Sequence, residues 1–325
     1  MTSSCPCCAS TESRLLFSGL ADRLFRTSQE TFDLRECARC QVIFLEPAPR
    51  GPELARFYPA GYWWQTTAGP QRVRPWHRLL EFYRRVVLRG QVRKMERLVG
   101  PHPPRGARLL DIGCGDGVFL DVCSGLPLAR VGLDQSLGAL QAARQRGGLE
   151  LAQAHVEALP FAGESFYVIT MFHVLEHVPD PSLCLQEVRR LLSAGGWLVV
   201  QVPNAGSLQR RLMGRRWAGF DVPRHLANYT PRNLRALLER NGFRIARQSH
   251  FSLRDNAAIP VMSLLPRLYP PARRLASRPP GAARAFTHNL LDLIFLCLVL
   301  LTMPLAWGES LLGRGGTVVV TARKA

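Results

Sequence analysis

The sequence predicts an α/β fold, in which helices cover both faces of a mostly parallel sheet. Two observations indicate this class. Short apolar runs alternate with helical segments from Ala107 onward, and alternation of this kind is typical of parallel sheets. A glycine-rich loop at 113–117 also separates the first of these strands from the first of these helices.

Six segments are predicted to be strands, because each is a short apolar run bounded by turn residues. They are RLLDIG (108–113), RVGLD (130–134), YVITMFH (167–173), WLVVQVP (197–203), FRIARQSHF (243–251) and GTVVVTARK (316–324). Helices are predicted at 117–124, 137–146 and 182–192. A further helix is predicted to begin at Pro231 behind the cap residue Thr230 and to end at Gly242.

The chain is predicted to have four parts. Residues 1–50 form a small zinc-ribbon-like unit, and residues 51–106 form a helical segment and a linker. The α/β domain comprises 107–251 and 316–325, and residues 252–315 form an apolar helical insertion before the last strand. The linker is placed at PHPPRG (101–106), because consecutive prolines end a helix.

The chain is strongly basic, with a formal net charge of +18 and a pI near 10.6. This charge predicts attraction to nucleic acid, anionic lipid or an anionic substrate, without choosing among them. An arginine-biased genome would produce much of the same excess. We expect no secretory signal, since MTSSCPCCAS is polar. The nine cysteines are therefore expected to be thiols, metal ligands or core residues.

The segment LLDIGCGDGVFL (109–120) predicts a cofactor site. Its glycines let the backbone turn and approach a ligand, and the following helix points amide donors at the same place. One strand later, Asp134 ends VGLD, where a carboxylate accepts ribose hydroxyls. A dinucleotide site would have its third glycine one position later, at Val118. Asp111 would repel a pyrophosphate but suits an ammonium and a sulfonium, so S-adenosylmethionine (SAM) is favoured over NAD.

Four segments resemble successive motifs of class I SAM-dependent methyltransferases of the ubiquinone/menaquinone-biosynthesis type. They are DIGCGDG (111–117), VGLDQS (131–136), EALPFAGESFYVITMFHVLEHVPDP (157–181) and LLSAGGWLVVQVPN (191–204). The resemblance covers about 108–242. It implies a Rossmann-like sheet of six parallel strands plus one antiparallel strand, and SAM as the cofactor. It says much less about the methyl acceptor.

The resemblance also implies which residues line the cofactor. These are Asp111, Gly113, Cys114, Gly115 and Gly117 of the loop, Asp134 at the ribose, Gln135, His155 and Val156 at the adenine, and Phe172 and His173 at the amino group. Two positions depart from the family pattern. His155 stands where an acidic residue is common, and Tyr167 follows Phe166 where the family has Asp. We expect cofactor binding to survive both.

Candidate catalytic residues lie in HVLEH (173–177) and DVPRHLANYT (221–230). Glu176 and His177 follow the fourth predicted strand, at the sheet edge where ligands bind, and His225 lies in a loop expected to cover the acceptor. With a hydroxyl acceptor, a general base contributes about 10²–10⁴-fold. Alternatively, Glu176 and His177 only stabilise the start of a helix. The candidate pocket walls are Trp217, Phe220 and Tyr229.

Two CxxC pairs, Cys5 with Cys8 and Cys37 with Cys40, predict a structural zinc site. Cys7 is an alternative ligand. The phrase CARCQVIFLEPAP (37–49) resembles the second zinc knuckle found ahead of many methyltransferases of this kind. The other cysteines, expected in the core or in loops, are Cys114, Cys123, Cys184 and Cys297.

The insertion contains LIFLCLVLLTMPLAW (293–307), which carries no charge. As a helix, fifteen residues reach about 22 Å, less than the ~30 Å hydrocarbon layer. If the last strand lies antiparallel between the two preceding strands, as the resemblance implies, both ends of the insertion are anchored in one domain. A helical hairpin that dips into one leaflet or lies at its surface is therefore expected, with Arg273, Arg274, Arg278 and Arg284 at anionic headgroups. The alternative is a buried core helix or a dimer helix.

Together these features predict a SAM-dependent methyltransferase that is cytoplasmic and peripheral or monotopic on the membrane. Its acceptor is expected to be a hydrophobic or lipid-linked small molecule, methylated on oxygen or carbon. The alternatives are an RNA-directed methyltransferase whose zinc unit and arginines bind phosphate, a nucleotide-sugar-directed methyltransferase, and a non-catalytic SAM-binding scaffold. The oligomeric state stays open.

Overall fold

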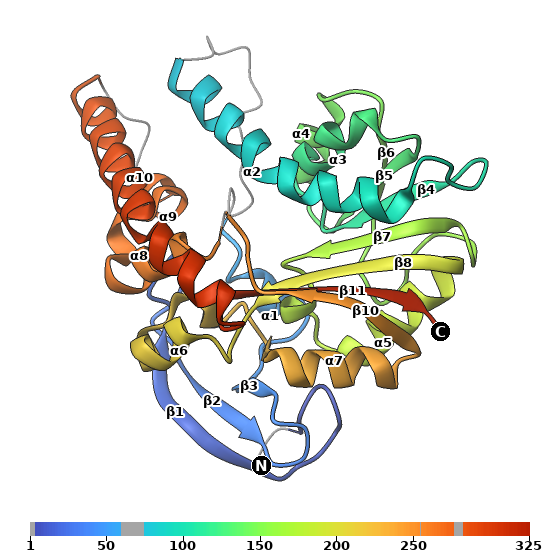
Figure 1. The fold of residues 1–325 in the computed structure, drawn as a ribbon. Helices are drawn as coiled ribbons and strands as arrows, with labels where there is room; N and C mark the ends of the chain where they lie inside the picture. The colour runs from blue at the N-terminus through green and yellow to red at the C-terminus, as the bar shows by residue number, and fades with distance from the viewer. Residues whose placement is uncertain (1–3, 60–74, 254, 276–281) are drawn as a thin grey trace.

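A computed structural model describes residues 4–59, 75–253, 255–275 and 282–325 (Figure 1). Its larger sheet has seven strands in the order β10-β11-β8-β7-β4-β5-β6. They are β4 (Arg108–Ile112), β5 (Ala129–Asp134), β6 (Glu150–Gln153), β7 (Phe166–Phe172), β8 (Leu192–Pro203), β10 (Phe243–Ser249) and β11 (Thr317–Lys324). Only β11 runs antiparallel to its neighbours, β8 and β10. The predicted Rossmann-like sheet, six parallel strands plus one antiparallel strand, is confirmed.

Helices cover both faces of this sheet (Figure 1). One face carries α2 (Pro75–Val99), α3 (Val118–Val122) with the 3₁₀ turn η1 (Cys123–Gly125), and α4 (Leu137–Arg144), and the other carries α5 (Pro181–Leu191) and α7 (Pro231–Arg240). Met95 of α2 packs with Leu109 and Phe119 in one buried cluster. The cap predicted for α7 is present, since the Thr230 hydroxyl accepts from the Asn233 amide at 3.3 Å.

A second sheet of four strands, in the order β1-β2-β3-β9, forms the N-terminal unit. Its strands are β1 (Ser13–Ala21), β2 (Thr31–Cys37), β3 (Ile43–Glu46) and β9 (Ala227–Asn228), and a short helix, α1 (Pro52–Ala55), follows β3. The β1–β2 hairpin separates the two CxxC pairs. Because β9 belongs to the loop after β8, the N-terminal unit is joined through backbone hydrogen bonds to the loop that carries His225.

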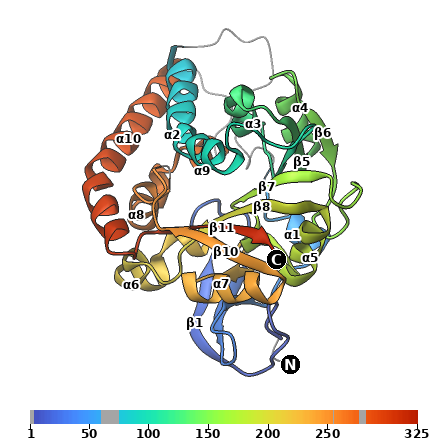
Figure 2. The ribbon, with the colours of Figure 1, turned by 45° about the vertical axis from the view of Figure 1, so that its right-hand side comes forward.

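The insertion consists of α8 (Ala258–Leu264), the 3₁₀ turn η5 (Pro266–Leu268), α9 (Pro270–Leu275) and α10 (Ala282–Leu311). In both views, α10 lies at the opposite end of the molecule from β6 (Figures 1 and 2). The predicted length was wrong. α10 has 30 residues and contains Pro304 in its interior. Its stretch Thr287–Leu311 is long and apolar enough to cross a membrane by length and composition alone.

The interpretation of this helix as a core helix is also wrong. Only 17% of its most apolar window is buried, and Cys297 is exposed rather than in the core, unlike Cys114, Cys123 and Cys184. Arg273 pairs with Asp292 of α10 and does not face outward. The side chains of Arg274, Arg278 and Arg284 lie outside the described residues.

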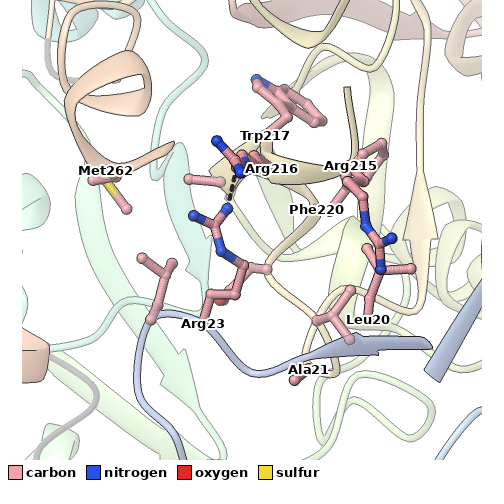
Figure 3. A pocket seen from close by; sticks show the side chains of 12 residues that line it. Leu20, Ala21, Arg23, Arg215, Arg216, Trp217, Phe220 and Met262 are labelled. Carbon is pink, nitrogen blue, oxygen red and sulfur yellow. Dashed lines mark hydrogen bonds between the residues drawn. The ribbon is translucent and has the colours of Figure 1, made fainter. Parts of the chain in front are cut away.

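Between β8 and β9 the chain forms α6 (Leu208–Met213) and the 3₁₀ turns η3 (Gly214–Arg216) and η4 (Ala218–Phe220). This segment meets the end of β1 and the helix α8 around a hollow, lined among others by Leu20, Arg216 and Met262 (Figure 3). The hollow therefore lies at the junction of the N-terminal unit, the larger domain and the insertion.

Candidate functional site

The glycine loop after β4 has the backbone conformation that its sequence predicts. Gly113, Gly115 and Gly117 all have positive φ, at 72°, 54° and 72°. A Cβ at Gly113 would stand 2.5 Å from Cγ2 of Val174, whereas a Cβ at Gly115 would meet nothing within 4 Å. Gly113 is thus required by packing, and the space beside Gly115 is open to a ligand.

Two buried carboxylates lie beside this loop. Asp134, at the end of β5, accepts from the backbone amides of Gly115 at 2.9 Å and Ser136 at 2.8 Å. Asp111, in β4, accepts from the Thr170 hydroxyl at 2.7 Å. Burial raises the pKa of Asp111 to about 7, and the charge of Asp134 adds to the effect. The pair is therefore costly to ionise in the free protein.

A cationic cofactor fits this pair. Among the described residues, neither Asp111 nor Asp134 forms an ion pair, whereas Asp116 in the same loop binds Arg84 and Arg146, at 2.8 Å and 2.9 Å. A ligand that carries an ammonium and a sulfonium would supply the missing positive charge. The two carboxylates therefore match the charge of SAM and would repel a pyrophosphate.

The other residues expected at the cofactor lie in this loop or at the carboxyl ends of β5, β6 and β7. Cys114 is buried, with its thiol 3.7 Å from the Gly115 carbonyl oxygen. Phe172 packs edge-on against Phe119. Gln135, at the end of β5, accepts through its carbonyl from Gln153. Farther along the chain, His155 is exposed and Val156 packs against the core.

His173 differs from expectation in one respect. Its backbone amide already donates to the Gln201 carbonyl at 2.8 Å. The expected backbone contact with the cofactor's amino group would therefore use the His173 carbonyl oxygen. The backbone at His173 has a φ of 58°, a conformation that bulky residues rarely adopt.

The three predicted catalytic residues come together. The ligand atoms of Glu176, His177 and His225 all lie within 4.8 Å of one another, and the two imidazole rings pack edge to face with centroids 4.7 Å apart. Glu176 is buried, and its Oε2 has no hydrogen-bond partner among the described residues. The loop after β8 thus brings His225 onto the turn η2 (Leu175–His177) after β7.

Backbone carbonyls fix the orientation of both imidazoles. Nδ1 of His177 lies 3.0 Å from the Arg224 carbonyl oxygen, and Nδ1 of His225 lies 2.8 Å from that of Gly219. Since a carbonyl only accepts, each ring donates through Nδ1 and keeps a lone pair on Nε2. Burial lowers the pKa of His177 to about 4, with a smaller contribution from the charge of nearby His225. The cluster can accept a proton, or it can hold a divalent cation.

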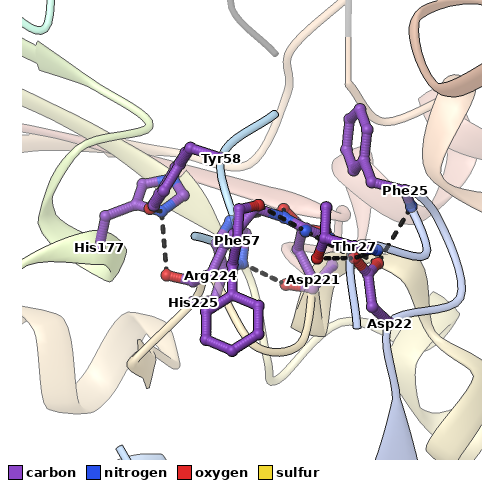
Figure 4. A network of polar contacts seen from close by, with 10 residues as sticks. Asp22, Phe25, Thr27, Phe57, Tyr58, His177, Asp221, Arg224 and His225 are labelled. Carbon is purple, nitrogen blue, oxygen red and sulfur yellow. Dashed lines mark hydrogen bonds and ion pairs between the residues drawn. The ribbon is translucent and has the colours of Figure 1, made fainter. Parts of the chain in front are cut away.

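A buried network ties this cluster to the N-terminal unit (Figure 4). Arg224 forms ion pairs with Asp22 at 2.8 Å and with Asp221 at 2.7 Å. The Tyr58 hydroxyl lies 2.8 Å from Nδ1 of His177. The sequence did not single out Tyr58 or Asp22, and no local pattern marks them. Only the fold brings them to the cluster.

Comparison with known proteins identifies the family. Residues 76–248, more than half of the chain, match the family described as a methyltransferase domain. The chain belongs to this methyltransferase family. It is a SAM-dependent enzyme, as the glycine loop and its two carboxylates predict.

Among its relatives is the ubiquinone biosynthesis O-methyltransferase of Dinoroseobacter shibae, 32% identical over 206 residues, covering 58% of this chain and 81% of that protein. The enzyme of the same name from Ruegeria pomeroyi is 35% identical over 159 residues, covering 47% and 63%. A crystal structure of a SAM-dependent methyltransferase from Thermotoga maritima aligns with a TM-score of 0.43 at 21% identity, covering 76% of this chain and 97% of that one.

The methyltransferase also contains a cluster of four thiols in its N-terminal unit. Cys5 and Cys40 lie 3.5 Å apart at their sulfurs, as do Cys8 and Cys37, and all four sulfurs lie within 4.8 Å. Tetrahedral zinc with bonds of about 2.3 Å would separate its sulfurs by about 3.8 Å, so the cluster fits this ion. The Cys7 thiol instead lies 3.8 Å from the Tyr229 hydroxyl, outside the cluster.

Proposed function

We propose that this methyltransferase works on a membrane surface and methylates a hydrophobic or lipid-linked small molecule. The observation that carries the proposal is an apolar stripe along α10. Its exposed members follow one another at intervals of one to four residues, and they are Leu290, Leu293, Ile294, Cys297, Leu300, Leu301, Pro304, Leu305, Trp307 and Leu311. Monomeric proteins rarely expose so long a continuous apolar surface to water.

Charge is absent from this stripe. The two acids in the stretch Thr287–Leu311 are buried: Asp292 pairs with Arg273, and Glu309 accepts from the side chain of Gln209. A lipid leaflet would cover the stripe, and the net charge of +18 favours an anionic surface. The enzyme would then be peripheral or monotopic on the cytoplasmic side.

The insertion also lies close to the catalytic edge. α10 ends at Leu311 shortly before β11 begins at Thr317, and Asp255 at the start of the insertion contacts His173 after β7. A membrane-bound α10 would therefore hold the carboxyl ends of the parallel strands near the lipid. A hydrophobic acceptor could reach the methyl donor without crossing much water.

In this proposal SAM lies along the glycine loop. Asp111 attracts its positive charge and Asp134 accepts its ribose hydroxyls. Gln135, His155 and Val156 surround the adenine, while the backbone of Phe172 and His173 contacts the amino group, His173 through its carbonyl. The methyl group passes in line from the sulfonium to the acceptor, a reaction helped mainly by orientation.

We propose that Glu176, His177 and His225 act on the acceptor. A hydroxyl acceptor is favoured over carbon, because the relatives from D. shibae and R. pomeroyi are named O-methyltransferases. The oxygen–methyl bond would form as the carbon–sulfur bond breaks, and the hydroxyl proton would pass to the cluster. A divalent cation on these side chains would lower the pKa of the hydroxyl.

Two further expectations enter the proposal. A structural zinc at Cys5, Cys8, Cys37 and Cys40 would hold the N-terminal unit together, and the four parts 1–50, 51–106, 107–251 with 316–325, and 252–315 would be the domains. An RNA acceptor would be bound by the arginines and the zinc unit, and neither RNA nor a nucleotide sugar accounts for the apolar stripe.

Vesicle flotation with the full chain tests membrane binding. Wild-type protein should float with vesicles that contain phosphatidylglycerol. The double variant Leu301→Ser/Leu305→Ser should stay below, whereas Leu15→Ser, which changes an exposed leucine of β1, should float like the wild type. Equal flotation of all three proteins, or of none, would overturn the membrane proposal.

Labelled SAM tests the acceptor. The enzyme is incubated with methyl-labelled SAM and a bacterial membrane extract, and the label should enter the organic phase. Asp134→Ala should abolish this transfer by removing the ribose carboxylate. Label that appears only in the aqueous phase would contradict a hydrophobic acceptor.

A further inference from the structure

The hollow between β1, η3–η4 and α8 is lined by both basic and apolar side chains (Figure 3). Arg23, Arg215 and Arg216 contribute guanidinium groups, while Trp217 and Met262 contribute apolar surface. The cavity is small, about 30 Å³, and opens to solvent. Its lining does not include the glycine loop, Glu176, His177 or His225, although Asp221 of the lining lies 4.0 Å from Nε2 of His225. The proposed chemistry does not use the hollow itself.

This hollow carries uncompensated positive charge. Within the described part of the chain, Arg23, Arg215 and Arg216 form no ion pair. The one acidic residue of the lining is Asp221, and its carboxylate is bound to Arg224, which is held in turn by Asp22 (Figure 4). The three exposed or half-buried guanidinium groups therefore have no counterion among the residues that the structure describes.

Backbone carbonyls hold two of these arginines in place. Arg23 donates to the carbonyls of Arg216 at 2.7 Å and Ser263 at 3.1 Å, and Arg215 donates to the Ser18 carbonyl at 3.0 Å. A guanidinium has five N–H donors, so donors remain on each group. Burial and the proximity of Arg216 lower the pKa of Arg23. A bound anion would relieve this repulsion.

Exposed leucines lie on α6, which precedes Arg215 and Arg216 in the chain, and at the end of α8, which contributes Met262 to the hollow. Leu212 of α6 is 74% exposed, Leu264 of α8 is 60% exposed and Leu265 is 44% exposed. α8 in turn packs on α10, where Val261 and Val299 share a buried cluster. The helix that contributes Met262 to the hollow is thus in contact with the helix that carries the apolar stripe.

We infer that this hollow binds the phosphate group of an amphiphile, whose hydrocarbon chain lies over the leucines of α6 and α8. Guanidinium groups match phosphate oxygens in geometry and charge. The direction of the chain toward α10 rests on the proposed membrane function, whereas phosphate binding itself does not. The phosphate belongs either to a membrane lipid or to the acceptor.

Calorimetry on the full chain in nonionic detergent tests the site. We expect dihexanoyl phosphatidic acid to bind more tightly than inorganic pyrophosphate, and dihexanoylglycerol not to bind. Arg216→Gln should weaken binding about tenfold, the loss expected for one charged hydrogen bond. The Arg216 guanidinium makes no hydrogen bond among the described residues, so this variant should fold. Arg244→Gln, at an exposed site on β10, serves as the control.

Two results would overturn the inference. Affinity that is equal in wild type and Arg216→Gln would show that the hollow is not the site. Equal affinity for pyrophosphate and for the alkylated phosphate would exclude an amphiphile. Arg23→Lys gives a second check, because it keeps the positive charge but removes the planar guanidinium that donates to two carbonyls. It should weaken binding less than Arg216→Gln.

Flotation then distinguishes the two sources of phosphate. If the ligand is a membrane lipid, phosphatidic acid in the vesicles should increase flotation of wild type but not of Arg216→Gln. If it is the acceptor, both should float equally and the variant should raise the KM for a phosphorylated acceptor. Failure of all proteins to float would remove the membrane proposal while leaving the calorimetric result intact.

Discussion

Nε2 of His173 lies 3.1 Å from Oδ2 of Asp255, which joins the end of β7 to the start of the insertion. The same carboxylate accepts from the Gln201 side chain at 2.8 Å and from the Ser252 hydroxyl at 2.6 Å. The other nitrogen of His173 lies 3.3 Å from Glu176. Asp255 of the insertion is therefore linked to the candidate catalytic carboxylate of Glu176 through one side chain, that of His173.

Replacement of Asp255 should loosen this junction. Asp255→Asn removes the negative charge that holds three donors, so we expect the free energy of unfolding to fall by about 1.5–3 kcal/mol. Chemical denaturation would measure this change. Asp180→Asn provides the matched control, because Asp180 caps α5 at an exposed site and asparagine caps a helix nearly as well. Similar losses in the two variants would contradict a specific role for Asp255.

The affinity for SAM should depend on pH through Asp111. Its pKa of about 7 means that the carboxyl is largely neutral below pH 7 in the free protein. Only the ionised form attracts the SAM ammonium, so the affinity should rise between pH 6 and pH 8 and binding should release a proton. Calorimetry in buffers of different ionisation enthalpy measures both effects, and in Asp111→Asn both should disappear.

The raised pKa of Asp111 also affects the stability of the protein without SAM, because ionisation of this buried carboxyl is then unfavourable. The pKa of Asp111 is at its ordinary value of 3.8 in the unfolded chain and rises to about 7 in the folded protein. The unfolded chain therefore loses its proton first, and this carboxyl lowers stability as pH rises from about 4 to 7. Saturating SAM should reverse the trend. A denaturation midpoint in Asp111→Asn that falls as steeply as in wild type over this range would contradict the assignment.

Much of the cofactor site could be predicted because its determinants are local. The glycines of 113–117 and the carboxylates Asp111 and Asp134 follow strands whose apolar runs are readable in the sequence. β6 was not located, because Glu150–Gln153 is short and polar for a strand. Tyr58 and Asp255 were missed for a different reason, since each reaches its histidine from a distant part of the chain.

The error in the length of α10 has an electrostatic origin. The uncharged run at 293–307 begins directly after Asp292 and ends shortly before Glu309. In the folded chain Asp292 pairs with Arg273, and Glu309 accepts from the Gly316 amide. Partners from other segments thus allow the helix to continue through residues that seem to bound it. Local hydropathy cannot supply those partners.

The zinc content of cysteine variants should distinguish Cys7 from the four expected zinc ligands. Cys8→Ser should lower the zinc content from one ion per chain, measured by mass spectrometry, and destabilise the β1–β2 hairpin. Cys7→Ser should retain the ion, because its thiol faces Tyr229. We also expect Cys8→Ser to slow methyl transfer, since β9 links this unit to the loop of His225. Loss of zinc in Cys7→Ser would show that the ligand set is different.

Glu176→Gln should separate catalysis from cofactor binding. Its Oε2 is buried with no partner among the described residues and lies with His177 and His225, so the amide should lower kcat by about 10²–10⁴-fold. The Kd for SAM should stay within about twofold, because Asp111 and Asp134 are unchanged. Glu187→Gln, on the surface helix α5, should keep both values. Tyr58→Phe should have a smaller effect on kcat, since it removes one contact to His177.

A chelator tests whether the cluster of Glu176, His177 and His225 acts through a bound cation. If dialysis against a mild chelator that spares the zinc lowers kcat, and Mg²⁺ or Mn²⁺ restores it in wild type but not in Glu176→Gln, the cluster acts through a bound cation. An unchanged kcat in Glu176→Gln would mean that this carboxylate only supports the turn after β7.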